Sequence, residues 1–235
     1  MFSKIDKIKL DNYFNELAKI YKRKSHGYNF EFILVGGASI LVNYNFRDVT
    51  NDIDAYYLPS SDINDAIKKV SIKFNLNPNW INDDFKETKS YSDKIAEFST
   101  FYKSYKDIIE VRTIKDEYLV AMKLMSGRIY KNDISDIVGI ISYSNKNNNI
   151  ITFERIDKAV KDLYGSWKDI DEKLIITLKE ILSSKKLDKL YSDTINEEIN
   201  SRQQLVEFNK KYDNAINEAN IVDILNMLNK KDRKK

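Results

Sequence analysis

The most constraining feature of this chain is an apolar, strand-like run that ends in two glycines and is followed by an Asp-x-Asp pair. Residues 32–39 read Phe-Ile-Leu-Val-Gly-Gly-Ala-Ser, and residues 47–54 read Arg-Asp-Val-Thr-Asn-Asp-Ile-Asp. Side chains alternate between the two faces of a strand, so Asp52 and Asp54 are expected on one face and Ile53 on the other. Two adjacent carboxylates repel each other unless a cation lies between them. The pattern therefore predicts a strand, a glycine turn, a short helix and a second strand that carries a cation site.

The two halves of this pattern predict complementary binding sites. The carboxylates of Asp52 and Asp54 offer the oxygen ligands that suit Mg²⁺ or Mn²⁺. Gly36 and Gly37 allow backbone N–H groups to approach an anion, and the N-terminus of the following helix favours negative charge. Alone, either half is more often a plain turn or a solvated strand face. Together they predict a phosphate-binding turn beside a divalent-metal site, the equipment for phosphoryl or nucleotidyl transfer.

The composition restricts the available chemistry. The 235 residues contain no cysteine and one histidine, which excludes disulfides and thiolate sites and argues against a histidine-based zinc site or a Ser-His-Asp triad. The net charge is only +3, so the overall charge does not demand a nucleic-acid partner. The chain has no apolar run of the roughly eighteen residues that a membrane span needs, and its first ten residues lack a signal-peptide core. We expect a cytoplasmic protein with no membrane partner.

The hydrophobic pattern predicts an α+β fold with two domains. A small mixed sheet flanked by helices is expected in residues 1–145, and a helical bundle in residues 146–235. An Asn-rich segment at 145–149 is the expected linker. Strands are expected at 30–35 and 53–58, and as a hairpin at 95–105 and 108–114 with a turn at 105–107, whereas 75–88 is expected to be irregular. Helices are expected at 4–24, 38–44, 63–75, 116–127, 131–143, 153–164, 167–183, 187–209 and 211–229.

A second block of interest runs from residue 118 to residue 137. Its first part reads Tyr-Leu-Val-Ala-Met-Lys-Leu-Met-Ser-Gly-Arg, and residues 131–137 read Lys-Asn-Asp-Ile-Ser-Asp-Ile. Lys123 lies in the middle of the apolar run, so it either extends past an apolar stem to solvent or reaches into a cleft. Asp133 and Asp136 are three residues apart and therefore share one helix face.

These two blocks resemble the signature of the nucleotidyltransferase superfamily, in which an apolar residue and Gly-Gly or Gly-Ser precede a short helix and Asp-x-Asp. The finer resemblance is to its AbiEii- and MenT-like branch, through residues 35–39 and 47–54 and through the Ala-x-Lys-Leu, Arg and Asp-x-x-Asp elements of the second block. The resemblance covers roughly residues 32–140. It implies a nucleotidyltransferase fold for residues 1–145 and an enzyme that moves a nucleoside monophosphate from an NTP to an acceptor.

The resemblance also implies roles for individual residues. Asp52 and Asp54 would be catalytic and would ligate Mg²⁺ or Mn²⁺. Ser39 would contact phosphate through its hydroxyl, or it is a plain first-turn helix residue. The full set expected to hold the NTP phosphates is Gly36, Gly37, Ser39, Lys123 and Arg128. Lys123 would also be catalytic.

The third carboxylate of the site is less defined. The branch motif favours Asp136 as a catalytic residue, with Asp133 next to it, whereas Glu110 lies on a later strand of the type that carries an acid in many superfamily members. Any of these acids has the alternative of a helix-surface or capping role. Arg128 either neutralises phosphate charge or clamps Asp133 or Asp136.

Arg47 and Thr50 have two interpretations each. They belong to the motif, but Arg47 also has the alternative of bracing Asp52, and Thr50 that of ordering the turn into the second strand.

Partners follow from the same resemblance. It implies a toxin of a bacterial toxin–antitoxin or phage-defence system, with a cognate antitoxin protein and with tRNA or another nucleic acid as acceptor. One alternative is a catalytically inactive nucleotidyltransferase fold that serves as a binding or regulatory protein. Another is a helical RNA-binding protein, based on 15 tyrosines and a basic tail at 229–235, which is otherwise a solvated terminus.

Overall fold

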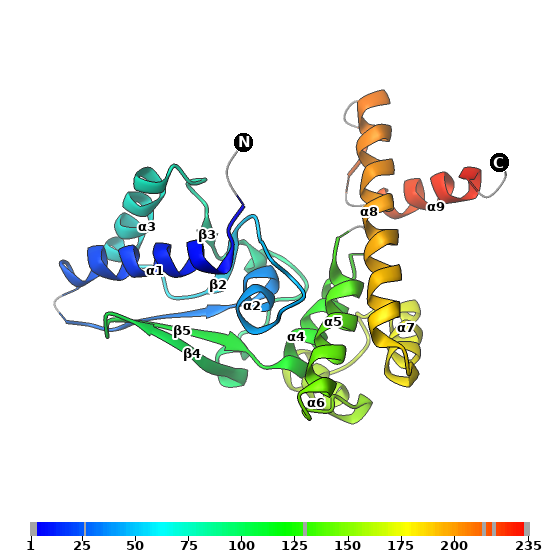
Figure 1. The fold of residues 1–235 in the computed structure, drawn as a ribbon, viewed down its shortest axis with the longest axis horizontal. Coiled ribbons are helices and arrows are strands. Elements are labelled where there is room, and N and C mark those ends of the chain that lie inside the picture. Colours follow the sequence, from blue (N-terminus) through cyan, green and yellow to red (C-terminus); the bar gives the residue numbers. More distant parts are fainter. Residues whose placement is uncertain (1–3, 26, 129–130, 213–214, 218–219, 233–235) are drawn as a thin grey trace.

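The computed structural model describes residues 4–25, 27–128, 131–212, 215–217 and 220–232, with the side chains of residues 229–232 outside the description. The chain has a mixed α+β fold in which a sheet with its covering helices stands beside a group of helices formed by the C-terminal half (Figure 1). This confirms the fold class expected from the sequence. Within these ranges, no helix is long and apolar enough to cross a membrane.

The sheet has five strands in the order β3-β2-β1-β5-β4. The central strand β1 pairs in parallel with β5 and antiparallel with β2, while β3 runs parallel to β2 and β4 antiparallel to β5. The strands are β1 (Phe30–Leu34), β2 (Ile53–Tyr56), β3 (Ile81–Asn82), β4 (Ser99–Tyr105) and β5 (Ile109–Ile114).

Helices α1 and α3 cover one face of the sheet, and helices α4 to α8 form the second group (Figure 1). The long helix α8 runs past this group (Figure 1), and α9 packs against it through a small core of Leu205, Ile224 and Leu225. The helices are α1 (Lys7–Lys22), α2 (Gly36–Asn43), α3 (Ser61–Phe74), α4 (Asp116–Ser126), α5 (Asp133–Lys146), α6 (Phe153–Tyr164), α7 (Glu172–Ser183), α8 (Leu187–Lys211) and α9 (Ile221–Asp232), with 3₁₀ turns η1 (Asp84–Glu87) and η2 (Ile95–Phe98).

Strand β1 joins two hydrophobic cores because both of its faces are apolar. Phe32 and Leu34 pack into the core under α1 and α3, whereas Ile33 and the following Val35 pack into the core formed by α4 to α7. A near-continuous apolar run is what a strand buried on both faces requires. The strand that positions the glycine turn is therefore held from both sides.

The predicted hairpin is confirmed, and its turn has a clear conformational cause. Lys106 and Asp107 both adopt left-handed backbone conformations, with φ of 53° and 54°. Two consecutive residues with positive φ match the right-handed twist of the flanking strands, as in type I′ turns. The hairpin β4–β5 thus closes one edge of the sheet.

Three local predictions are corrected by the structure. Residues 75–88 are not wholly irregular, because β3 pairs with β2 and η1 follows it. Helix α7 begins at Glu172 rather than 167, since Trp167 stacks on Phe153 outside the helix with ring centroids 5.5 Å apart. Helix α9 begins at Ile221 rather than 211. Residues 233–235 of the basic tail lie outside the described residues.

The Asn-rich segment at 145–149 is a hydrogen-bonded turn rather than an open linker. Helix α5 continues to Lys146, and the Asn145 side chain accepts a hydrogen bond from the backbone N–H of Ile151 at 3.1 Å. Ile141 before this turn and Ile156 after it belong to the same hydrophobic core. The division of the chain into domains 1–145 and 146–235 stays a prediction.

A second connection joins the loop after α2 to the helices of the C-terminal half. The Tyr191 hydroxyl on α8 donates a hydrogen bond to the backbone oxygen of Phe46 at 2.9 Å. The Phe46 ring lies so close to α5 that a Cβ at Gly139 would stand 2.7 Å from it. Only glycine leaves room for this contact, which fixes the loop that carries Arg47.

We predict that Gly139→Ala destabilises the protein although alanine is the better helix former. Overpacking against Phe46 should cost about 1–3 kcal/mol, against a helix-propensity gain of about 1 kcal/mol. In a Phe46→Leu background the same change should be neutral or stabilising, because the ring edge is gone. Urea denaturation of the four proteins measures the coupling, and equal effects of Gly139→Ala in both backgrounds would contradict the contact.

Candidate active site

A cavity of about 740 Å³ opens between the sheet and the helices of the C-terminal half. Its walls come from the N-terminus of α2, the segment from Arg47 to Asp54, residues 82–90, helix α4, the start of α5 and one residue of α8. This volume lies within the roughly 300–1,000 Å³ range of small-molecule sites. Both sequence blocks therefore meet at one cavity, although about seventy residues separate Asp54 from Lys123.

The two acids of the Asp-x-Asp motif both line this cavity. Ile53 between them is fully buried in the sheet core, while Asp54 is partly buried and Asp52 exposed. Burial first, and then the negative charge of Asp52, raise the pKa of Asp54 to about 6, although the charges of Lys123 and Arg128 act in the opposite direction. Neither acid forms an ion pair with any described residue. Their repulsion is what a bound cation would relieve.

The glycine turn lies directly against these carboxylates. Gly36 has φ of +55°, and a Cβ there would stand 3.0 Å from Asp54 Oδ2. A Cβ at Gly37 would stand 2.9 Å from Arg47 Nη1 and 3.0 Å from Thr50 Oγ1. Larger residues would push the N-terminus of α2 away from the acids. The first N–H groups of a helix have no partner within the helix, so they offer donors to an anion next to the carboxylate pair.

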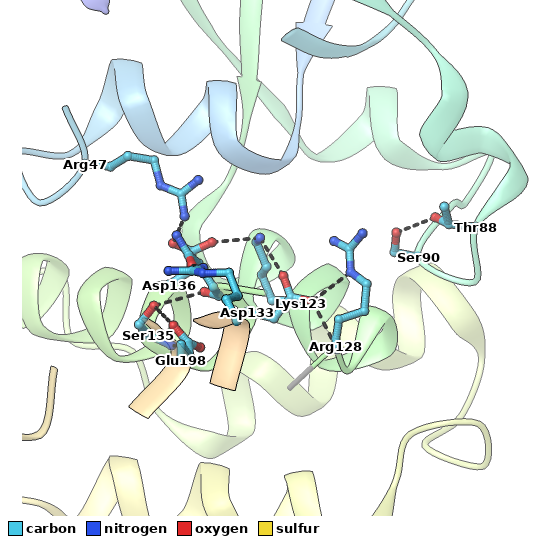
Figure 2. Close-up of polar contacts among 11 residues, drawn as sticks. Arg47, Thr88, Ser90, Lys123, Arg128, Asp133, Ser135, Asp136 and Glu198 are labelled. Carbon is cyan, nitrogen blue, oxygen red and sulfur yellow. Dashed lines mark hydrogen bonds and ion pairs between the residues drawn. The ribbon is translucent and has the colours of Figure 1, made fainter. Parts of the chain in front are cut away.

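A buried cluster of ion pairs forms the opposite wall (Figure 2). Lys123 Nζ lies 2.8 Å from Asp133 Oδ1 and 2.8 Å from Asp136 Oδ2. Arg128 Nε lies 3.1 Å from Asp133 Oδ2, and Arg47 Nη2 lies 2.5 Å from Asp136 Oδ1. We call these five residues the Lys123 cluster. It joins the loop after α2 to helices α4 and α5.

The structure decides between the two interpretations of Lys123. Its side chain is buried and lines the cavity, so it does not extend to open solvent. Burial lowers its pKa, but Asp136 and Asp133 outweigh that effect and hold the pKa above its usual value. Burial raises the pKa of Asp133, but the charges of Lys123 and Arg128 outweigh burial and lower this pKa to about 2. Lys123 and Asp133 are therefore both charged at neutral pH.

Helix α8 supports the cluster from behind, which sequence reasoning missed. The buried Glu198 accepts hydrogen bonds from the Ser135 backbone N–H at 3.1 Å and from Ser135 Oγ at 2.5 Å (Figure 2). Arg202 donates to the Asn132 side chain. Both contacts hold the first turn of α5, from which Asp133 and Asp136 project. Burial raises the pKa of Glu198 to about 7.

The roles of Arg47, Thr50 and Arg128 are partly those expected. Arg47 pairs with Asp136 rather than bracing Asp52. Thr50 does order the turn into β2, since its hydroxyl donates to the Asp52 backbone oxygen at 3.0 Å. Arg128 clamps Asp133 through Nε, and Figure 2 shows its terminal amino groups directed away from that acid. These groups remain available to an anion in the cavity.

Two predicted site residues do not reach the cavity. Ser39 is fully buried within α2 and is not part of the cavity wall. Glu110 pairs with Arg112 at 3.1 Å and lies opposite Glu31, near the start of β1. The glycine turn follows the other end of β1, roughly 10 Å away at about 3.3 Å per residue.

Several cavity residues escaped the sequence analysis. Asp84 follows the two-residue strand β3, which is too short to give a periodic signal, and Asn82 pairs with Asp54 in register. Lys4, Lys131 and Arg202 come from three separate parts of the chain and also line the cavity. No group of three or more His, Cys, Asp or Glu in the described ranges is arranged to hold one metal ion. The candidate metal ligands are therefore the pair Asp52 and Asp54.

Comparison with known proteins agrees with this site. The family model described as "Nucleotidyltransferase of unknown function (DUF6036)" matches residues 8–173. This range includes the whole sheet, the glycine turn, the Asp-x-Asp pair and the Lys123 cluster. The chain therefore belongs to this nucleotidyltransferase family. No curated protein and no solved structure matches it.

We predict that Asp54 contributes a loss of stability to the metal-free protein as the pH rises from about 4 to about 6. The Asp54 pKa is about 6 in the folded protein and about 3.9 in the unfolded chain, so the folded state binds more protons across this window. The loss should reach up to about 3 kcal/mol. Asp54→Asn should remove this slope and be more stable than wild type at neutral pH.

Urea denaturation in EDTA at several pH values measures both profiles. Glu198 contributes a slope of the same sign toward its pKa of about 7, so the difference between the two proteins isolates Asp54. Parallel profiles for wild type and Asp54→Asn would contradict the assignment.

We also predict that Lys123→Met destabilises the protein by about 3–5 kcal/mol, because it leaves Asp133 and Asp136 buried with fewer cationic partners. Lys68→Met on the exposed side of α3 is the matched control and should change stability by less than about 0.5 kcal/mol. Adding Asp133→Asn to Lys123→Met should recover part of the loss. Thermal and urea unfolding provide the comparison; a mild effect of Lys123→Met alone would argue against the cluster as a stabilising contact.

Proposed function

We propose that the protein is a Mg²⁺-dependent nucleotidyltransferase that transfers a nucleoside monophosphate from an NTP to an acceptor hydroxyl. The observation that carries this proposal is the contact between the Gly36–Gly37 turn and Asp54 in a single cavity. That contact places donors for phosphate next to carboxylates that lack an ion-pair partner among the described residues. Membership of a nucleotidyltransferase family supports the reaction class.

Different residues of the cavity bind the metal ion and the phosphates of the NTP. Mg²⁺ or Mn²⁺ held by Asp52 and Asp54 would supply Lewis-acid stabilisation of the charge on the phosphates. Gly36 and Gly37 present backbone N–H groups to the triphosphate. Arg128 offers its terminal amino groups while Nε remains fixed to Asp133, which is the geometry of a preorganised phosphate contact.

The remaining cavity residues set up the transfer itself. The acceptor oxygen forms a bond to the α-phosphorus as the bond to the pyrophosphate oxygen breaks, and pyrophosphate leaves. The hydroxyl proton needs a base. Asp133 and Asp136 are neutralised by cations, so they position Lys123 rather than accept protons. Asp84, which lines the cavity and forms no ion pair within the described ranges, is the better base.

The finer proposal is that the protein acts as a toxin of a toxin–antitoxin or phage-defence system. It is supported by the resemblance to the AbiEii- and MenT-like branch at Lys123, Arg128, Asp133 and Asp136, which all meet at the cavity. On this proposal the acceptor is tRNA or another nucleic acid, and a cognate antitoxin protein limits the activity.

The alternative is a nucleotidyltransferase fold that binds nucleotide without turnover. The arrangement of the acids argues for catalysis. Burial and the charge of Asp52 raise the pKa of Asp54, so the folded protein bears the cost of keeping two acids together. A regulatory fold has no physical need for this cost. Label transfer distinguishes the two functions.

We predict that Asp52→Asn and Asp54→Asn each reduce transfer by at least about a hundredfold, as loss of a metal ligand should. The assay incubates the protein with Mg²⁺, each α-³²P-labelled NTP in turn, and either total RNA or total protein as acceptor. Asp107→Asn is the matched control, because it makes the same chemical change at an exposed left-handed turn residue that does not line the cavity.

The possible outcomes separate the two functions. Wild-type transfer by Asp54→Asn would overturn the proposed metal site. If wild-type protein binds Mg²⁺–NTP but labels neither RNA nor protein, the binding alternative is favoured.

A further inference from the structure

Two hydroxyl side chains on the loop after η1 form a pair at the wall of the cavity. Thr88 and Ser90 both line the cavity, and their hydroxyl oxygens lie 2.8 Å apart (Figure 2). Neither residue belongs to the Asp-x-Asp motif, the glycine turn or the Lys123 cluster. The pair is therefore a polar feature of the cavity that the transfer chemistry proposed above does not use.

The contacts of Thr88 determine the direction of the hydrogen bond between the two hydroxyls. Thr88 Oγ1 lies 2.7 Å from the backbone oxygen of Phe85. A carbonyl oxygen only accepts, so the single hydroxyl hydrogen of Thr88 points to it. Thr88 can then only accept from Ser90, and this bond uses the hydroxyl hydrogen of Ser90. Ser90 Oγ therefore offers lone pairs to the cavity but no hydrogen.

Ser90 is also fixed through its backbone. The Tyr164 hydroxyl on α6 donates a hydrogen bond to the Ser90 backbone oxygen at 2.8 Å. Burial raises the pKa of Tyr164, so its hydroxyl remains a donor at neutral pH. Ser90 itself is buried, and its one hydroxyl contact within the described chain is the one with Thr88. A fixed acceptor at a cavity wall is the kind of polar group that orients a ligand.

An acceptor at this place selects a particular part of an NTP. Ionised phosphates have only acceptor oxygens, so they gain nothing from Ser90 and have the glycine turn and Arg128 as donors. The nucleoside part has donors in its ribose hydroxyls and base N–H groups. The cavity wall also contains the buried apolar side chains of Val35, Leu119 and Met122, which suit the faces of a base.

We propose that Ser90 is a specificity-determining residue that accepts a hydrogen bond from the nucleoside of the bound NTP, and that Thr88 is the positioning residue that orients its hydroxyl. This inference rests on the proposed function, since it concerns the NTP of that transfer. The donor is a ribose hydroxyl or an N–H group of the base, and nucleotide analogues distinguish the two.

The test measures Mg²⁺–nucleotide binding by calorimetry for wild type and Ser90→Ala. The ligands are the four common NTPs and the 2′-deoxy and 3′-deoxy forms of the NTP that binds most tightly. Ser90→Ala should weaken binding of that NTP by at least about fivefold, because a donor inside the cavity loses its acceptor. Ser104→Ala is the matched control, because it makes the same change at an exposed residue of β4 that does not line the cavity.

The analogues identify the donor. If one deoxy form binds wild type and Ser90→Ala within about twofold, the donor is the ribose hydroxyl that this form lacks. If both deoxy forms remain as sensitive to Ser90→Ala as the NTP, and the NTPs differ in their sensitivity, the donor is a base N–H group. If Ser90→Ala weakens every ligand equally, no nucleoside donor contacts Ser90 and the proposal is wrong.

Variants of Thr88 test the orientation of the hydroxyl. Thr88→Val keeps the shape of the side chain but frees the Ser90 hydrogen, so Ser90 can donate as well as accept. The preference for the NTP over the analogue that lacks the donor should fall at least about twofold, whereas Thr88→Ser should retain the wild-type preference. A role of Thr88 in stability alone would lower the melting temperature of Thr88→Val and leave this preference unchanged, which would overturn the role assigned to Thr88.

The failure of this inference is distinguishable from the failure of the proposed function. If wild type does not bind Mg²⁺–NTP, the proposed function fails. If wild type and Ser90→Ala bind every nucleotide alike, the Ser90 contact is overturned and the proposed function stands. If thermal melting shows that Ser90→Ala is unfolded, the nucleotide preference of Thr88→Val decides, because Thr88 is exposed.

Discussion

The ion pairs of Lys123 with Asp133 and Asp136 are the interaction on which the rest of the cavity depends. They are buried, and burial of charge is costly unless partners compensate it. Arg128 and Arg47 provide that compensation from outside α5. Because Arg47 belongs to the loop after α2, the same ion pairs that neutralise the acids also hold the sheet against the helices. The shape of the cavity is thus a consequence of charge neutralisation.

This arrangement explains why the acids of the cavity have different roles. Asp133 and Asp136 are surrounded by cations and serve to position Lys123. Asp52 and Asp54 form no ion pair in the described chain, and burial together with the charge of Asp52 raises the pKa of Asp54. The neighbouring cations therefore decide which aspartates of the cavity have a structural role and which can bind a metal. Carboxylates that the protein does not neutralise are the ones left to bind a cation.

The sequence predicted the parts of the site that follow from local patterns. Alternation predicted Asp52 and Asp54 on one face of a strand; β2 begins only at Ile53, but both acids do line the cavity. The apolar run before Gly36 predicted β1. Patterns do not report which end of a strand meets a neighbour, so the sequence could not show that Glu110, on β5, lies outside the cavity wall. Nor do they reveal pairings across long separations. Arg47 pairs with Asp136, 89 residues later, and no spacing rule predicts that contact.

The sequence also predicted most helices of the fold, and the elements that it failed to predict share a physical cause. Helices with strong apolar periodicity were found near their expected bounds, but β3 has only two residues and no period to detect. The Asn-rich turn looked like a linker because asparagine favours turns. Its side chains instead form hydrogen bonds: Asn149 donates to Asp116 on α4 at 2.9 Å. Because that turn is fixed, α6 follows α5 at a defined angle and the core remains continuous across it.

Helix α8 shows why the C-terminal helices belong to the site although the chemical motifs all precede them. Glu198 holds the N–H and hydroxyl of Ser135, and Tyr191 holds the backbone of Phe46. These contacts fix the two segments that carry Asp136 and Arg47. If α8 detached, both partners of that ion pair would lose their support, and the buried charges would become exposed to water. Formation of the cavity is therefore coupled to docking of α8. A ligand that binds only the formed cavity stabilises that docking by its free energy of binding.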